Sequence, residues 1–508
     1  MKPLYTNLEQ EIGKSAELEK LLIANGSMCT CASDDERNRR TALETLEMLA
    51  TKWVREQHQN DTTMNGGRKE EEEHAVVNPT IITFGSYSLR VHRQESDIDA
   101  LCLFDKRITR EMFFTDFVDF LCQDSRVSGL LAIENAFTPV VKFLLHGIYI
   151  DLLFASVSDN SKLDNFHNLG RPKSLSMDTE YKVEDSDLAG MDEASVRSLN
   201  GVRVTQFIEQ KVKNLPHFRT CLCAIKAWAI EHGCYSNVLG FLGGVNFALL
   251  LTHVCLEYPE SESWPASVLF KQFFRTFALW EFPQPVMLTQ EVNRNPPFNM
   301  ARMYVWDQSQ QRDVMPIITP VYPSMNSSHN VALPQHRRIK DELIRTAFKL
   351  EQGFYWDSIL QDCDFFRRNS NFIQVTISAK EGDEYYKWCS FCRSKLRLLI
   401  SSLETRQTSI WPFAKFFEDE SCDFEGGGPH QPRRLFFFMA LRFTSPLNSG
   451  KVNLKRLMLD FLHKVNSFKG RTEGMDLQIS HAVQHRLPAF ILDKYIDGSN
   501  PQQSRDET

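Results

Sequence analysis

The stretch that decides the fold reads Thr-Ile-Ile-Thr-Phe-Gly-Ser-Tyr at residues 80–87 and Asp-Ile-Asp-Ala-Leu-Cys-Leu-Phe at residues 97–104. Each part contains a run of β-branched and large apolar residues, which favours a strand. A third apolar run, at residues 148–155, contains one acidic residue, Asp151. Because side chains alternate between the two faces of a strand, Asp97 and Asp99 project to the same side. The intervening Ile98 then turns toward a core.

The three aspartates predict a binding site for divalent metal. An isolated buried carboxylate costs several kcal/mol unless it is paired or bound to a cation, and Asp151 lies in a run that we expect to be buried. Oxygen ligands without neighbouring His or Cys favour Mg²⁺ or Mn²⁺ over zinc. Beside them, Gly85 permits close approach of a phosphate, and Ser86 can donate to it from both its amide and its hydroxyl.

Each motif has a simpler interpretation when taken by itself. An Asp-x-Asp pair is common at exposed strand ends, and most Gly-Ser pairs are plain turns. The order of the motifs favours a functional site. A strand, the Gly-Ser turn and the Asp-x-Asp strand precede a helix with Phe113, Phe117 and Leu121 at helical spacing, and a hairpin whose second strand carries Asp151 follows.

Composition indicates a large multidomain chain without a membrane span. At 508 residues and 42% hydrophobic content, about two to four domains with buried cores are expected. The net charge of −7 gives no sign of nucleic acid, so any RNA path must be a local basic stripe. Twelve cysteines without a regular framework indicate reduced thiols. Residues 1–14 lack the apolar core of a signal peptide, and residues 238–256 contain glycines, Asn246 and His253, which favours a buried helix.

The quoted segments resemble the catalytic signature of the polymerase-β-type nucleotidyltransferases. Further segments resemble the nuclear-type eukaryotic poly(A) polymerases, at residues 198–201, 224–229, 235–245 and 315–323. The resemblance implies an α+β multidomain fold: a polymerase-β-like nucleotidyltransferase palm, an α-helical central domain and a C-terminal ferredoxin-like (RRM-like) domain. It also implies template-independent transfer of AMP from ATP to RNA 3′ ends. The implied partners are RNA, ATP and 3′-end processing factors, with no membrane, and the chain is expected to be a monomer.

The resemblance also assigns site residues. Asp97, Asp99 and Asp151 would hold two Mg²⁺ or Mn²⁺ ions and carry the catalysis. The ATP contacts would be Phe84, Gly85, Ser86, Asn200, Lys226, Tyr235, Asn237, Gly244 and Val245. Among them, Lys226 and Tyr235 would contact the triphosphate, Asn200 would lie near the sugar, and Asn237 and Val245 would lie around the adenine ring. A lysine on an apolar helix face is otherwise most often a surface residue whose stem alone is buried.

Breaks in the pattern predict the domain organisation. We expect a catalytic domain at 45–158, a central domain from 1–44 and 159–349, an RNA-binding ferredoxin-like domain at 350–495, and a short tail at 496–508. Polar composition predicts a mobile loop at 60–73 and a partly ordered excursion at 156–192.

Beyond residue 350 the pattern changes to alternating strands and helices. Strands are predicted around Ile373 to Ile377, at 435–443 and at 477–483, with an amphipathic helix at 454–465. No clear RNP aromatic motif is present, so RNA binding there depends on the resemblance. The candidate basic residues are Arg393, Lys395, Lys455 and Arg456, which would also suit a solvated helix face.

Two other functions stay open. A terminal uridylyltransferase or another RNA nucleotidyltransferase would share the three aspartates and differ in base choice. A non-catalytic RNA-binding scaffold could descend from such an enzyme, although the presence of all three aspartates argues against it. The sequence departs from the family at Arg90, where glycine is usual, and at residues 92–96, where the usual loop is small and contains glycine. The family resemblance implies the nucleus, whereas the end at Thr508, without the long tail that carries import signals, would suit the cytoplasm.

Overall fold

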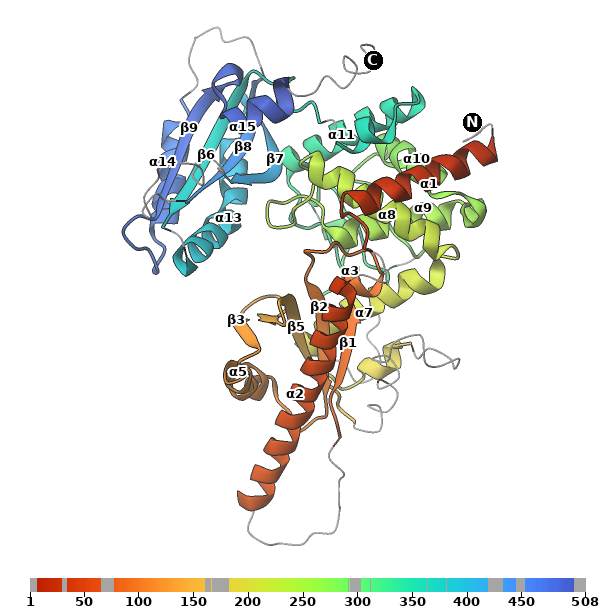
Figure 1. Cartoon of the computed structure of the whole chain (residues 1–508), viewed down its shortest axis with the longest axis vertical. Helices are drawn as coiled ribbons and strands as arrows, with labels where there is room; N and C mark the ends of the chain where they lie inside the picture. The colour runs from red at the N-terminus through yellow and green to blue at the C-terminus, as the bar shows by residue number, and fades with distance from the viewer. Residues whose placement is uncertain are drawn as a thin grey trace.

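The computed structural model forms three lobes of mixed α and β structure (Figure 1). One lobe contains a five-stranded sheet, the second is helical, and the third contains a four-stranded sheet, which confirms the predicted α+β class. The structure describes residues 7–29, 34–64, 77–159, 166, 182–290, 292, 303–310, 312–361, 363–380, 382–418, 433–444 and 453–497.

The first sheet has the strand order β1-β2-β5-β4-β3. Its strands are β1 (Thr80–Phe84), β2 (Ile98–Phe104), β3 (Val127–Ile133), β4 (Val140–Leu145) and β5 (Ile148–Ser156). β2 and β5 run parallel, and the other neighbours run antiparallel. The three predicted strands are confirmed, with Asp97 one residue before β2.

Helices cover both faces of this sheet. The helical elements are α2 (Asp34–Met64), α3 (Gly85–Ser88), α4 (Arg110–Met112), a π-helical turn (Phe113–Phe117), α5 (Val118–Cys122) and α7 (Glu193–Lys211). On one face, α2 and the run from α4 to α5 pack on the sheet through Trp53, Phe117 and Phe104. On the other face, α7 contributes Leu199 and Val202. The palm core is therefore completed by segments distant in sequence.

Two predicted irregular segments are partly described. The prediction of a loop at 60–73 is wrong for residues 60–64, because α2 continues to Met64. Once a helix is anchored by buried residues such as Trp53, further turns add at little cost even in polar sequence. Residues 65–73 of that loop lie outside the described residues. Within 156–192, the structure describes 156–159, 166 and 182–192, where a 3₁₀ turn (Asp185–Leu188) buries Leu188.

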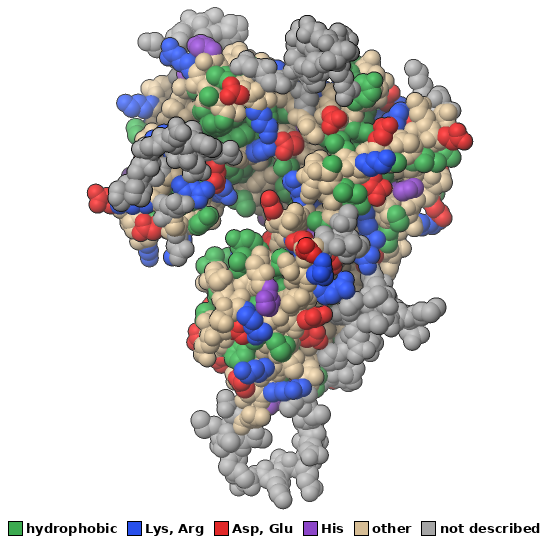
Figure 2. Space-filling model, viewed as in Figure 1, with side chains coloured by type: hydrophobic (Ala, Val, Ile, Leu, Met, Phe, Trp, Pro, Cys, Tyr) green, Lys and Arg blue, Asp and Glu red, His purple; other side chains and the backbone are tan. Residues whose placement is uncertain are grey.

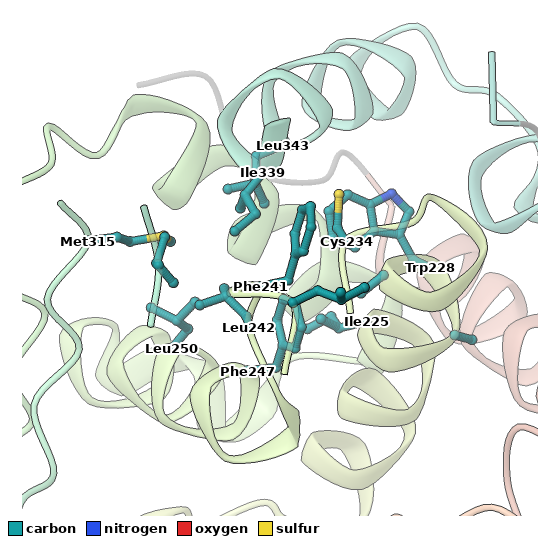
Figure 3. Close-up of a cluster of buried hydrophobic side chains, with 14 of the residues drawn as sticks. Ile225, Trp228, Cys234, Phe241, Leu242, Phe247, Leu250, Met315, Ile339 and Leu343 are labelled. Carbon is teal, nitrogen blue, oxygen red and sulfur yellow. The ribbon is translucent and has the colours of Figure 1, made fainter. Parts of the chain in front are cut away.

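The central lobe is built from helices around one apolar core. They are α1 (Leu8–Ala24), α8 (Leu215–Glu231), α9 (Gly244–Glu257), a 3₁₀ turn (Pro259–Ser263), α10 (Ala266–Leu279), a 3₁₀ turn (Gln308–Gln310), α11 (Leu333–Glu351) and α12 (Trp356–Leu360). Figure 3 shows Trp228 of α8, Phe247 of α9 and Leu343 of α11 converging on this core. α1 contacts α8 and α10.

The apolar stretch at residues 238–256 enters α9 through a tight turn at Gly240, whose φ is 81°. A Cβ at Gly240 would lie 2.7 Å from the carbonyl oxygen of Asn330, so only glycine fits this turn. Phe247, Leu249 and Leu250 are buried, which confirms the predicted core helix. Within the described part of the chain, no helix has both the length and the apolar character that crossing a bilayer requires.

The third lobe has the βαββαβ order of a ferredoxin-like fold. Its elements are β6 (Asn371–Ala379), α13 (Asp383–Leu403), β7 (Thr408–Glu418), β8 (Arg433–Phe443), α14 (Lys455–Asn466), β9 (Asp476–Val483), a 3₁₀ turn (Gln484–Arg486), α15 (Ala489–Leu492) and a π-helical turn (Asp493–Asp497). The strand order is β7-β8-β6-β9 with antiparallel neighbours, which confirms the predicted fold. β7 was not predicted from the sequence, because residues 408–413 are all buried and show no alternation.

β7 also joins the third lobe to the central lobe. The amide of Ala414 donates to the carbonyl oxygen of Gly233 at 2.9 Å, and Lys415 is ion-paired with Glu231 at 2.9 Å. A Cβ on Gly233 would lie 2.4 Å from the ring of Phe413, so the two lobes are in close contact here. In Figure 1, α11 lies beside β7 at the same junction.

Candidate active site

The three predicted aspartates lie at the end of the palm sheet next to α3. Asp99 on β2 is opposite Asp151 on the parallel strand β5, and Asp97 precedes β2. Asp97 is exposed, whereas Asp99 and Asp151 are half-buried. Gly85 has a φ of 67°, and a Cβ on it would lie 2.5 Å from Asp99 Oδ2. A side chain at Gly85 would therefore collide with the carboxylate, and glycine is required for both reasons.

Neighbouring negative charges help to raise the pKa of both Asp99 and Asp151. Burial raises the pKa of Asp99 to about 7, and the charges of Asp97 and Asp151 add to this effect. Burial also raises the pKa of Asp151, against the opposing effect of Lys142. Carboxylates that resist ionisation together are stabilised by a shared cation, so this donor set fits divalent metal.

Lys142 is a residue that sequence analysis missed. It lies on β4 directly opposite Asp151, and its ammonium forms an ion pair with that carboxylate. The hairpin joining β4 and β5 turns at His146-Gly147, and counting back from a two-residue turn pairs residue 142 with residue 151. The pairing of Lys142 with Asp151 could therefore have been predicted from the sequence. Among the described residues, the three aspartates do not bring ligand atoms within 4.8 Å of one another, and Asp151 is instead paired with Lys142.

Helices α7 and α9 bring several predicted nucleotide residues next to the Gly-Ser turn. α3, which contains Ser86, contacts both α7 and α9. Asn200 on α7 donates from Nδ2 to the carbonyl oxygen of Pro323 at 3.1 Å. A Cβ on Gly201 would lie 2.7 Å from the ring of Phe84, so α7 approaches the turn closely. The amide of Gly85 donates to Thr205 Oγ1 of α7 at 3.1 Å, a contact that the sequence did not suggest.

Lys226 and Tyr235 lie on the aspartate side of the central lobe. Lys226 is only 6% exposed, and its Nζ donates to the carbonyl oxygen of Val91 at 2.7 Å. Burial lowers its pKa, and Asp97 and Asp99 are among the charges that oppose this effect. Burial raises the pKa of Tyr235 to about 12, and the same two aspartates add to it. The predicted surface alternative for Lys226 is wrong, because its ammonium is buried.

Asn237, Gly244 and Val245 follow at the entrance to α9. A Cβ on Gly244 would lie 3.1 Å from the hydroxyl of Tyr235, whereas Asn237 and Val245 are exposed. The side chain of Asn237 accepts from Asn330 Nδ2 at 3.2 Å, and Asn330 in turn accepts from Arg397 of α13. This chain of contacts connects the predicted base position to the C-terminal lobe.

The loop that departs from the family has an unusual backbone. Arg90 has a φ of 57°, in the left-handed region that favours glycine. Arg90 also donates its amide to the carbonyl oxygen of Tyr87 at 2.9 Å, so the turn keeps its shape in spite of the substitution.

The predicted RNA residues lie on two helices of the C-terminal lobe. On α13, Arg393 lies 4.5 Å from the ring of Phe416 and Lys395 lies 5.4 Å from the ring of Phe391. On α14, Lys455 and Arg456 are exposed in the first turn. Figure 2 shows a hollow between the palm and the C-terminal lobe, and Figure 1 shows α13 along that side.

Among the described residues, the sheet of the C-terminal lobe does not expose a row of aromatic rings for base stacking. On the face opposite α13 and α14, Phe413 and Phe438 are buried in a cluster with Phe366 and Tyr495. This packing agrees with the lack of an RNP motif in the sequence.

Comparison with known proteins places the chain in a family. Three family models match in chain order: the poly(A) polymerase nucleotidyltransferase domain over residues 4–212, the poly(A) polymerase central domain over 217–355, and the "Poly(A) polymerase predicted RNA binding domain" over 364–426. A solved structure of the Cid1 poly(U) polymerase with MgGTP superposes with a TM-score of 0.46 at 14% identity, and the match covers 70% of this chain and 99% of that chain.

Two curated relatives match nearly the whole chain. The poly(A) polymerase of Dictyostelium discoideum is 33% identical over 94% of this chain, and nuclear poly(A) polymerase 4 of Arabidopsis thaliana is 34% identical over 97%. The chain spans 57% and 63% of the lengths of these relatives. On the strength of the three family models and these relatives, the chain belongs to the poly(A) polymerase family.

Proposed function

We propose that this chain is a template-independent RNA nucleotidyltransferase that transfers AMP from ATP to RNA 3′ ends. The observation that carries the proposal is the register of Asp99 and Asp151 on parallel strands, beside Asp97 and the Gly-Ser turn. The names of the relatives support ATP as the substrate, and the exposed basic residues of α14 support RNA.

In this proposal, Asp97, Asp99 and Asp151 hold two Mg²⁺ or Mn²⁺ ions. When bound, such ions lower the pKa of an attacking hydroxyl and neutralise the departing pyrophosphate. The chain's own residues prepare the site. Strand pairing holds Asp99 and Asp151 next to each other, so the two carboxylates repel each other in the metal-free chain, and a bound cation would relieve this repulsion. Lys142 is ion-paired with Asp151, and this ion pair would have to break before Asp151 could bind a metal ion.

The other proposed contacts bind and orient the nucleotide. Gly85 leaves room for a phosphate, and Ser86 can donate to it. The ammonium of Lys226 has three N–H donors. Among the described residues, one of them donates to the carbonyl oxygen of Val91. The remaining two can meet triphosphate oxygens. Asn237 and Val245, which are exposed at the start of α9, would border the base.

Primer extension with each nucleoside triphosphate supplied separately tests the proposal. The expected result is extension of an RNA primer with ATP in Mg²⁺ or Mn²⁺, and little extension with UTP, CTP or GTP. Equal use of UTP and ATP would contradict the adenine assignment. No extension with any nucleotide would favour the scaffold function instead.

Lys226→Ala is expected to raise the KM for ATP by about 10- to 100-fold, because hydrogen bonds to charged groups contribute about 1.5 to 3 kcal/mol. The KM for the RNA primer should stay within about twofold, since removing one contact to ATP leaves the RNA path unchanged. Steady-state kinetics with ATP and primer varied independently would measure both. Lys213→Ala, whose side chain is 68% exposed, is the control that should change neither. An unchanged KM for ATP in Lys226→Ala would mean that Lys226 donates only to the carbonyl oxygen of Val91 and does not contact ATP.

The double variant Lys455→Ala, Arg456→Ala is expected to weaken RNA capture without affecting ATP. Two lost phosphate contacts should make the slope of log K against log salt shallower by about 1.4. Filter binding of a labelled oligoadenylate at several salt concentrations would measure the slope. The matched control is Lys52→Ala, Arg55→Ala on the exposed side of α2. If both double variants keep the wild-type slope, the first turn of α14 does not contact RNA.

We further propose residence in the nucleus, since the Arabidopsis relatives are named nuclear poly(A) polymerases. Exclusion of the fluorescently tagged chain from nuclei would contradict this proposal.

A further inference from the structure

Three metal-ligating side chains meet outside the proposed active site. Cys29 follows α1, Asp35 lies in the first turn of α2, and His92 lies in the loop after α3. Their ligand atoms all lie within 4.8 Å of one another. Cys29 and Asp35 are half-buried, so the cluster lies just beneath the surface, where an ion could enter.

The second observation is the state of His92, which is only 6% exposed. Within the described residues, neither of its ring nitrogens has a hydrogen-bond partner. The nearest carboxylate oxygen, Oε2 of Glu36, is 3.8 Å from Nε2, which is too long for a hydrogen bond. Buried polar groups in native proteins are nearly always paired, so His92 requires an explanation.

We propose that Cys29, Asp35 and His92 bind one Zn²⁺ ion, with solvent in the fourth position. A thiolate combined with an imidazole selects zinc over the hard cations Mg²⁺ and Ca²⁺. Binding replaces the S–H bond of Cys29 by a zinc–sulfur bond, and the proton passes to solvent.

The charges around the cluster suit a bound dication. Arg39 donates from Nε to Asp35 Oδ2 at 2.7 Å, which leaves the other oxygen of Asp35 for the metal. The thiolate of Cys29 and the carboxylate of Asp35 would balance the two positive charges of zinc, and Glu36 beside them is ion-paired with Arg40 at 3.8 Å.

The proposed ion would fasten the loop that leads into the catalytic strand. His92 directly follows Val91, whose carbonyl oxygen accepts from Lys226, and it precedes Asp97 by five residues. Arg39 already joins this loop to α2 through the carbonyl oxygen of Gln94 at 2.7 Å. Zinc would be a second anchor between the same two segments, and its binding does not depend on the proposed enzymatic activity.

Cobalt provides the test, because Co²⁺ replaces Zn²⁺ and absorbs in the near ultraviolet when a thiolate is a ligand. The full-length chain, freed of metal with a chelator, would be titrated with Co²⁺ and then with Zn²⁺. We expect one equivalent of Co²⁺ to produce the thiolate band and Zn²⁺ to abolish it. Co²⁺ bound to the three aspartates has only oxygen ligands from the protein and gives no such band, so the two sites are distinguished.

Two variants separate this site from adventitious binding. Cys29→Ser should abolish the band, whereas Cys122→Ser, at an exposed cysteine on α5, should leave it unchanged. His92→Gln should weaken Zn²⁺ binding by at least about 100-fold, beyond the usual loss for a group outside the first ligand shell. If His92→Gln fails to fold, Cys29→Ser alone tests the zinc site, because Cys29 lies near the surface and its substitution should leave the fold intact. No band in the wild-type chain, or an undiminished band in Cys29→Ser, would overturn the proposal.

Discussion

Asp99→Ala is expected to lower the rate of the proposed AMP transfer by about 10³-fold or more, which corresponds to roughly 4 kcal/mol of transition-state stabilisation. Asp99 lies opposite Asp151 in the sheet and against the backbone of Gly85, so no other described carboxylate can take its position. Single-turnover extension of an RNA primer at saturating ATP would measure the rate. Asp119→Ala, at an exposed aspartate on α5, is the control that should retain full activity.

The same variant should fold at least as well as the wild type in metal-free buffer. The pKa of Asp99 is raised from its usual 3.8 to about 7 in the folded chain. The folded chain therefore keeps a proton that the unfolded chain has lost, and wild-type stability falls as the pH rises through this interval. Asp99→Ala removes this loss, so its melting temperature without metal should equal or exceed that of the wild type at pH 8. Near-normal turnover would mean that the chemistry occurs elsewhere, and a much lower melting temperature would mean that Asp99 is structural.

Glu342→Gln is expected to destabilise the chain by about 3 to 5 kcal/mol, because it leaves buried cations without their counter-charge. Glu342 on α11 is 2% exposed and is ion-paired with Arg338 at 2.5 Å and with Arg368. It also contacts His232 Nδ1, at the end of α8, at 2.7 Å. Arg368 belongs to the segment before β6, so the network joins the central and C-terminal lobes. The midpoint of urea unfolding would measure the change.

The network also predicts sensitivity to acid. Burial opposes ionisation of Glu342, but Arg338, His232 and Arg368 outweigh it and hold the pKa well below its usual 4.5. The stabilisation is therefore complete above pH 4.5 and is lost as the pH falls below that value. Glu351→Gln, at the end of the same helix in a half-exposed pair with Arg275, is the control and should cost less than about 1 kcal/mol. Equal losses for the two variants would contradict a special role for the buried network.

Much of the palm and of the C-terminal lobe was predictable from local patterns. Alternation along 97–104 set Asp97 and Asp99 apart from the buried Ile98, and the two-residue turn at His146-Gly147 fixed the pairing of β4 with β5. Alternation in β6 and the apolar stripe of α14 predicted the ferredoxin-like order. β7 was not predicted, because residues 408–413 are all buried and show no alternation.

The sequence by itself determined the strands of the palm and the residues that we propose carry the chemistry, because strand and helix periods are local and a few motif residues carry the resemblance to the family. Only the tertiary structure decided where the polar groups of distant elements meet. It buried the ammonium of Lys226 beneath Val91, paired Glu342 with Arg368, and brought Cys29 to His92. Such contacts join residues 26 to 135 positions apart in the chain, as the hydrogen bonds of Glu342 and Lys226 illustrate. They form because the packing of whole helices and sheets sets the distances between side chains, and no pattern of a few neighbouring residues encodes those distances.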